Sequence, residues 1–393
     1  MILVYLIISI AGIFALGWLF RWTGQKINWP KDEWNIYFRD MSYLVGVGFI
    51  FAVALILFTL YVYFILQIKF FVWGVQLLVI CGLSGYIFRF LGRRIGTEGS
   101  RKLFRSMPVT AAFGILTVIL YALLAIFADF IAPYEQDEIF EVINALPGGN
   151  PDLGGDPRFI LGTDQLGRDL LSRLIYGAQN TVGIAFATTV FSFLIGITGG
   201  FLAATLGGWV DQALSRAVDA LMAIPQLIFA LLLMTIATAW AGSNKVMIMV
   251  YMVLIIAVLD STRVYRLSRA VGLNIVVMDF IEAAKVRGET LRYLLFREIL
   301  PNAMAPLLAE FGLRFCFVFL TISALSFLGI GIQPPLADWG TMVRDLAQFI
   351  NFAAFSPLTA TLPLLAAGAI ALLTVAVNFI VDWVLHKSSG LKS

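Results

Sequence analysis

Residues 181–206 have the sequence TVGIAFATTVFSFLIGITGGFLAATL, without one charged side chain. A helix needs about 20 apolar residues to cross roughly 30 Å of hydrocarbon, because it rises about 1.5 Å per residue. This stretch meets that requirement by itself and predicts a membrane-spanning helix. Its length and apolar character can be used to find further spans in the rest of the chain.

Further stretches have the same apolar character. The expected spans cover approximately residues 2–20, 43–66, 70–90, 108–132, 181–206, 217–240, 246–266, 303–332 and 358–384. The composition agrees, since 60% of the 393 residues are hydrophobic and 13% are charged. A soluble domain is about half apolar and a quarter charged. The predicted fold class is therefore an all-α polytopic membrane protein.

Basic residues near the ends of the spans predict the orientation. They are concentrated after the first, third and seventh spans, which places those segments in the cytoplasm. Residues 133–178 hold more acidic than basic side chains and are expected outside. The N-terminus is then outside and the C-terminus inside the cytoplasmic (inner) membrane. The first span lacks a basic leader and a clear cleavage site, so we expect it to be retained.

The chain is predicted to have two parts. Residues 1–106 form an N-terminal extension of three spans and a basic linker. Residues 107–393 form a six-span body with an external loop, 133–178, and a cytoplasmic loop, 267–302. Within the spans, the charged residues and prolines are candidates for pairing, snorkelling or helix bending. They are Asp219, Asp260, Arg263, the i, i+4 pair Glu310 and Arg314, Pro225 and Pro306.

Several classes of function are disfavoured. The net charge of +3 gives no clustered basic face for nucleic acid. Cys81 and Cys316 lie in apolar runs, and the single histidine, His386, is close to the C-terminus, so no metal site or histidine dyad is expected. A membrane enzyme would need convergent catalytic groups. The chain also has no G-x-x-x-x-G-K-[ST] loop and cannot bind ATP in that mode.

The cytoplasmic loop contains the most informative segment, residues 279–302, with the sequence DFIEAAKVRGETLRYLLFREILPN. It is amphipathic, and Gly288 favours a left-handed residue that ends the first helix. Pro301 suits the first turn of the next helix. The pattern predicts helix, sharp turn, helix and span. It is compatible with a knob that docks into a partner, with an amphipathic helix on lipid headgroups or with a charged loop.

The spacing of this segment resembles the EAA loop of ABC importer permeases. The matching residues are Glu282, Ala283, Ala284, Gly288, Leu300 and Pro301. The resemblance implies that this loop is the coupling helix that docks onto an ATPase. Glu298 departs from the general pattern, which has an apolar residue there, although a polar residue is common in the peptide-importer branch.

Two outer stretches resemble the dipeptide, oligopeptide and nickel importer permeases, second subunit type. One covers residues 161–177 and the other residues 325–340. The candidate residues at the external pore mouth are Thr163, Asp164, Gly167, Arg168, Asp169, Phe327, Gln333, Pro334 and Trp339. The resemblance covers about residues 107–385 and leaves the extension without an interpretation. The usual C-terminal motif of these permeases is also altered around Asn378 and Asp382.

The resemblance implies a six-helix type I importer core that translocates peptides or a similar small solute. The implied partners are a second permease subunit in a heterodimer, two ATP-binding subunits, an extracytoplasmic substrate-binding protein and membrane lipid, but no nucleic acid. No cofactor is expected on this chain, with ATP and Mg on the ATPase subunits. The alternatives are a permease of another ABC import branch and a self-standing secondary transporter, which would show repeat halves without the EAA loop.

Overall fold

The computed structural model describes residues 69–94, 97–149, 151–352 and 361–388. The expected spans 2–20 and 43–66 lie outside this part of the chain. The protein divides into two compact units, Met1–Cys81 and Gly82–Ser393. Helix α4, Lys69–Arg94, coincides with the third expected span and crosses the division. The predicted three-span extension, and its boundary at residue 106, therefore stay predictions.

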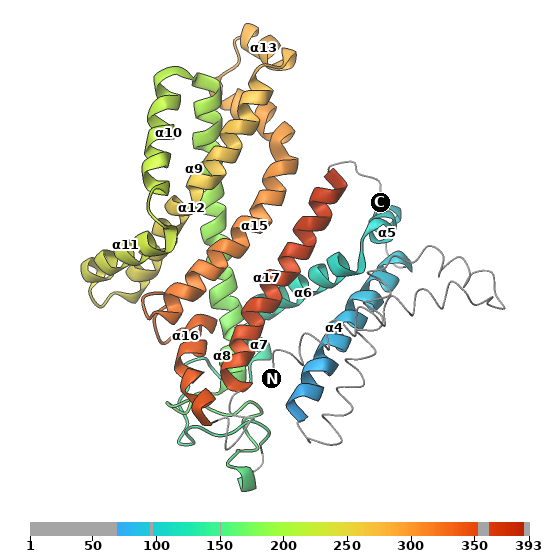
Figure 1. The fold of residues 1–393 in the computed structure, drawn as a ribbon, viewed down its shortest axis with the longest axis vertical. Coiled ribbons are helices and arrows are strands. Elements are labelled where there is room, and N and C mark those ends of the chain that lie inside the picture. Colours follow the sequence, from blue (N-terminus) through green and yellow to red (C-terminus); the bar gives the residue numbers. More distant parts are fainter. Residues whose placement is uncertain (1–68, 95–96, 150, 353–360, 389–393) are drawn as a thin grey trace, which may run out of the picture. The chain divides into compact units, whose positions relative to one another are not determined.

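All regular elements of the second unit that the structure describes are helical. After α4 they are α5 Glu98–Ser106, α6 Val109–Ile126, α7 Ala128–Ile131, η2 Pro151–Leu153, α8 Leu170–Gly177, η3 Ala178–Val182, α9 Gly183–Leu206, α10 Gly208–Met222, α11 Gln226–Ala241, α12 Lys245–Val276, α13 Asp279–Val286, α14 Leu291–Tyr293, η4 Leu294–Ile299, α15 Leu300–Phe327, α16 Trp339–Leu346, η5 Ala347–Phe352 and α17 Thr361–Ser388. Within this unit, α13 lies at one end of the long helices and the loop before α8 lies at the other (Figure 1).

Five continuous helical segments among the described residues are long and apolar enough to cross a membrane. They are Val109–Ile126, Leu170–Leu206, Lys245–Val276, Leu291–Phe327 and Thr361–Lys387. The multi-pass, all-α prediction is confirmed. Several of these segments extend beyond the expected spans. The backbone hydrogen bonds of the helix continue through the amphipathic residues that flank the apolar runs.

The span expected over 217–240 is a bent pair of helices, which together are long and apolar enough to cross a membrane. Helices α10 and α11 meet there at 89°. Pro225 is the residue that precedes α11, and its ψ of 123° is extended. Proline lacks a backbone N–H and disfavours helical geometry in the residue before it, so the helix ends at this point. The predicted bend at Pro225 is confirmed, and it is a break rather than a gentle kink.

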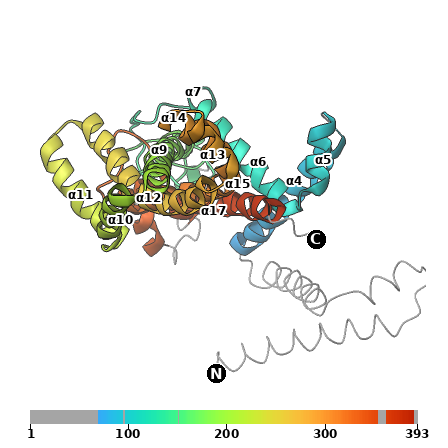
Figure 2. The same cartoon turned by 90° about the horizontal axis from the view of Figure 1, so that it is seen from above.

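Helices α9 and α12 pack side by side (Figure 1 and Figure 2). A Cβ atom at Gly196 would lie 2.8 Å from the backbone oxygen of Ser261. One at Gly200 would lie 2.7 Å from the backbone oxygen of Tyr265. The two backbones approach this closely because glycine has no side chain, as small residues allow in membrane helices.

A buried ionic cluster links α9, α12 and α15 halfway along α12. Asp260 accepts a hydrogen bond from the Ser192 hydroxyl at 3.0 Å and lies 3.7 Å from Nη1 of Arg314. The Nε atom of Arg314 lies 2.7 Å from a carboxylate oxygen of Glu310, so the expected i, i+4 pair is confirmed. The cluster compensates charges that would be costly in hydrocarbon. By contrast, Asp219 pairs with Arg266 at an exposed position.

The packing of α9 on α12 predicts a selective cost for one methyl group. Gly200→Ala should destabilise the protein by about 1–3 kcal/mol, because backbone atoms cannot yield as a side chain can. Thermal unfolding in detergent measures the change. Gly183→Ala on the same helix is the matched control, since no atom lies within 4 Å of its added Cβ. Equal melting temperatures for the two variants would contradict the close approach.

The ionic cluster predicts coupling between its members. Arg314→Leu should cost about 3–5 kcal/mol, because Asp260 would be left buried without its cation. Removing both charges, in the double variant Asp260→Leu and Arg314→Leu, should recover much of that loss. Unfolding measurements on the single and double variants form a double-mutant cycle. Strictly additive losses would show that the two groups do not interact.

Candidate functional site

The segment that links α12 to α15 forms a projecting knob, residues 277–290. Helix α13 ends in a Schellman arrangement: the Gly288 N–H donates to the Lys285 carbonyl at 3.0 Å and the Glu289 N–H to the Ala284 carbonyl at 3.2 Å. Gly288 has a φ of +80°, in the left-handed region that glycine adopts at little cost. The predicted sharp turn is therefore confirmed at that residue.

The chain leaves the turn through Thr290, whose hydroxyl accepts from the Tyr293 N–H at 3.3 Å. From Leu291 the helix runs without a gap through the π-helical turn η4 into α15. Pro301 does lie in the first turn of α15. The expected separation between the second short helix and the span is wrong, because the wide π-turn continues the helix up to the proline.

One face of α13 is anchored to the bundle. Ile281 and Ala284 are fully buried. Ile281 belongs to a hydrophobic cluster that includes Phe201 of α9, Ile275 of α12 and Leu307 of α15. The knob is therefore anchored through a buried cluster that α9, α12 and α15 share, which is not what a loose charged loop would form.

The other face of α13 is exposed and mixed in character. Glu282, Ala283 and Lys285 point away from the core. Val277 and Val286 are 81% and 84% exposed, next to these charges. Charged and apolar side chains are therefore both exposed on this face.

Glu298 has a place in this geometry. The Arg287 guanidinium lies 3.9 Å from the Glu298 carboxylate on η4 and 3.7 Å from that of Glu289. Arg287 thus links the turn after α13 to η4. The polar residue at 298, which departs from the general EAA pattern, has an ionic partner here.

The predicted pore-mouth residues of the first outer stretch are largely internal. Asp164, buried, accepts from Arg168 Nε at 2.7 Å and from the Leu166 N–H at 2.9 Å. Asp169 caps α8 through the Ser172 N–H at 2.8 Å. In this conformation these charges shape the external loop from within.

Thr163 and Gly167 also hold that loop. The Thr163 hydroxyl donates to the Val142 carbonyl at 2.8 Å and accepts from the Ala145 N–H at 2.9 Å. Gly167 has a φ of +79°, and a Cβ there would meet the Phe140 carbonyl. Both residues stabilise the turn in which the chain reverses direction before α8.

The second outer stretch is divided between core and surface. Trp339 is buried: its Nε1 donates to the Leu174 carbonyl at 2.9 Å and its ring meets Tyr121 edge to face. It therefore does not form part of an exposed lip. Gln333 is half-buried and bonds Gly331, whereas Phe327 and Pro334 are exposed.

Asp338 precedes Trp339 and is fully buried. Its carboxylate accepts from the Thr181 hydroxyl at 2.9 Å and from the Thr341 N–H at 2.8 Å. Burial raises the pKa of Asp338, while these hydrogen bonds oppose the rise. The carboxylate thus joins α16 to the start of the α9 span.

Gln136 is a residue that no sequence motif singles out. Its side-chain oxygen accepts from the Asn180 amide and from the Ala337 N–H, each at 2.9 Å. Its backbone oxygen accepts from Nη1 of Arg173 at 2.9 Å. One glutamine in the acidic loop therefore connects three segments. The sequence carries no signal for this role, because the partners are distant along the chain.

A side groove of about 580 Å³ lies between α9 and α12 near the same end of the helices. Polar Gln179 and Asn180 stand at one end of its lining, and Phe191 and Leu254 are among the apolar residues of the rest. Among the described residues, no group of three or more His, Cys, Asp or Glu side chains forms a metal site.

Comparison with known proteins agrees with this geometry. Residues 196–388 match the family described as binding-protein-dependent transport system inner membrane component. The chain is 35% identical over 238 residues to the di/tripeptide transport system permease protein DppC of Pseudomonas aeruginosa, covering 61% of this chain and 76% of that protein.

Two other relatives are similar. The peptide transport system permease protein SapC of Salmonella typhimurium is 34% identical over 284 residues, 72% of this chain and 90% of the relative. The glutathione transport system permease protein GsiD of Pectobacterium atrosepticum is 30% identical over 242 residues, 62% and 75%. The chain therefore belongs to the family of inner-membrane permease components of binding-protein-dependent ABC transport systems.

Proposed function

We propose that this permease subunit translocates peptides or a similar small solute, driven by ATPase subunits that dock on the knob of residues 277–290. The cargo class follows its relatives, whose names concern di- and tripeptides, peptides and glutathione. The chain supplies no ATP site of its own, so ATP and Mg belong to the partner subunits. The proposed complex has a second permease subunit, two ATPases and an extracytoplasmic binding protein.

The observation that carries docking is the division of α13 into two faces. Ile281 is buried in a cluster shared with α9, α12 and α15, while Glu282, Val286 and Val277 project outward. A push on the outer face would move the ends of α9, α12 and α15 together. Such rigid coupling suits a transporter that alternates between discrete openings.

The same faces disfavour the alternative of a helix lying on lipid. An interfacial helix presents its large apolar side chains to the acyl region and basic side chains to the headgroups. In α13 the large apolar residue Ile281 faces the protein, and the exposed residues are mixed: acidic Asp279 and Glu282 stand beside basic Lys285 and apolar Phe280 and Val286. Anionic headgroups would repel those carboxylates, whereas a basic cleft in an ATPase would attract them.

The groove between α9 and α12 is our candidate for one wall of the translocation path. Its polar end at Gln179 and Asn180 suits a backbone amide of a peptide, and its apolar remainder suits varied side chains. The second permease subunit would complete the enclosure.

Docking predicts a charge-sensitive surface. Glu282→Lys should leave the protein folded in the membrane, because Glu282 is exposed, but should abolish capture of the ATPase subunits and transport. Pull-down from membranes that contain the whole complex measures capture. Glu141→Lys, the same charge change in the external loop, is the control. Unchanged capture with Glu282→Lys, or an equal loss in the control, would contradict docking on the knob.

The cargo class predicts a transport phenotype. Cells that lack this chain should lose most uptake of labelled di- and tripeptides but retain uptake of free amino acids, because the binding protein delivers peptides to this pore. Restoring the wild-type chain is the control. Normal peptide uptake together with lost Ni²⁺ uptake would instead assign the chain to a nickel importer.

A further inference from the structure

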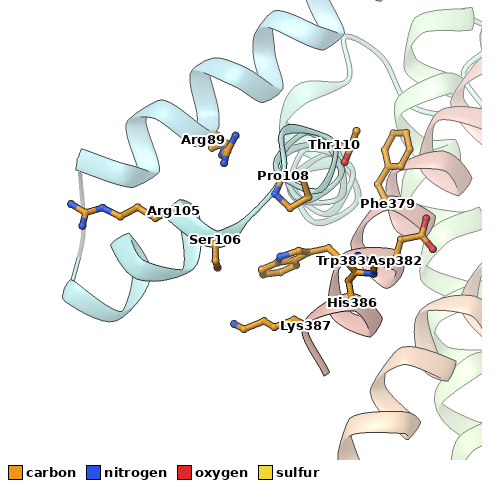
Figure 3. Close-up of a pocket in the computed structure, with 10 residues that line it drawn as sticks. All are labelled: Arg89, Arg105, Ser106, Pro108, Thr110, Phe379, Asp382, Trp383, His386 and Lys387. Carbon is orange, nitrogen blue, oxygen red and sulfur yellow. The ribbon is translucent and has the colours of Figure 1, made fainter. Parts of the chain in front are cut away.

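A cavity of about 670 Å³ lies in the second unit, lined by residues of α4, α5, the start of α6 and the last turns of α17 (Figure 3). It is lined by Arg89, Arg105, Ser106, Pro108, Thr110, Phe379, Asp382, Trp383, His386 and Lys387. None of these residues belongs to the knob or to the groove between α9 and α12.

The lining carries an excess of positive charge. Arg89 comes from α4, Arg105 from α5 and Lys387 from α17, so three separate helices each bring a cation. Asp382 is the acidic residue among the lining side chains. The Nε atom of Arg89 is buried and has no hydrogen-bond partner among the described residues. A buried donor of this kind needs an acceptor.

The first turn of α6 supplies further donors. Pro108 occupies the position before the helix and makes no side-chain cap, so the N–H groups of Val109 and Thr110 receive no side-chain acceptor from it. The hydroxyl of Thr110 also lines the cavity. Helix N-termini favour anions, and here the helix end adds to the three cations.

The walls of the cavity are held by packing. Met107, Ala111 and Ala112 are fully buried and pack with Phe104 and Trp383. The ring of Phe88 meets that of Phe104 edge to face at 5.3 Å. The cavity is therefore a built feature of the fold, in which the end of α4 and α5 are joined to the permease body.

The position identifies the anion. The cavity lies at the start of span α6 and the end of span α17, where spans of this length place the membrane–water interface. The Lys387 ammonium lies 5.4 Å from the Trp383 ring centroid, an aromatic and basic pairing typical of that depth. We propose that this cavity binds the phosphate headgroup of an anionic phospholipid, as basic pockets between membrane helices do.

The test uses the purified full chain in a neutral detergent, with phosphatidylglycerol as the probe and phosphatidylcholine as the neutral comparison. Native mass spectrometry should show retained phosphatidylglycerol on the wild type. Arg89→Gln combined with Arg105→Gln should weaken retention about thirtyfold, because two cations are lost. Lys387→Gln, on another helix and exposed, should weaken it several-fold.

The matched control is Arg101→Gln combined with Lys102→Gln, which removes two exposed charges from α5 outside the cavity. It should retain phosphatidylglycerol as the wild type does, and unchanged melting temperatures would show that all variants fold. Equal retention by the cavity and control variants would overturn the proposal. Displacement of the lipid by millimolar inorganic phosphate would also overturn it, because the site would then serve a free anion.

Discussion

The close approach of α9 and α12 is the contact on which the rest of the body depends. Gly196 and Gly200 let the two backbones meet, and without that contact neither helix would hold the other in register. Beyond it, Phe201 of α9 and Ile275 of α12 enter the cluster that anchors Ile281. The glycine contact thus determines where the knob stands. A displacement of the knob would therefore also displace the ends of both helices.

Polar groups form a second level of organisation, because hydrocarbon cannot satisfy them. Inside the bundle, Asp260 is held by Ser192 and Arg314. At the end of the helices opposite the knob, Asp164, Asp169 and Asp338 are buried with hydrogen-bond partners of their own. The acidic outer motifs therefore build a rigid cap over the start of α9. Phe327 and Pro334 remain exposed at this end of the helices.

Local chemistry explains which expectations from the sequence were right. The spans follow from apolar length, and the turn at Gly288 follows from the need for a positive φ. The bend at Pro225 was visible as a proline, but not its size, because 89° depends on how α11 packs. The exposure of the candidate residues was not predictable. Trp339 and Glu282 both lie in recognisable motifs, yet one is buried in the core and the other projects.

The sequence by itself determined that this chain spans a membrane several times. It also determined that residues 279–302 form two helical segments with a sharp turn at Gly288, as in the EAA loop of importers. Those features depend on neighbours along the chain, within a few helical turns. Only the tertiary structure decided which face of α13 is free, which outer residues are internal, and that Gln136 joins three segments. It also brought Arg89, Arg105 and Lys387 to one cavity. These arrangements depend on helices far apart in sequence, and their packing has no signature in a local pattern.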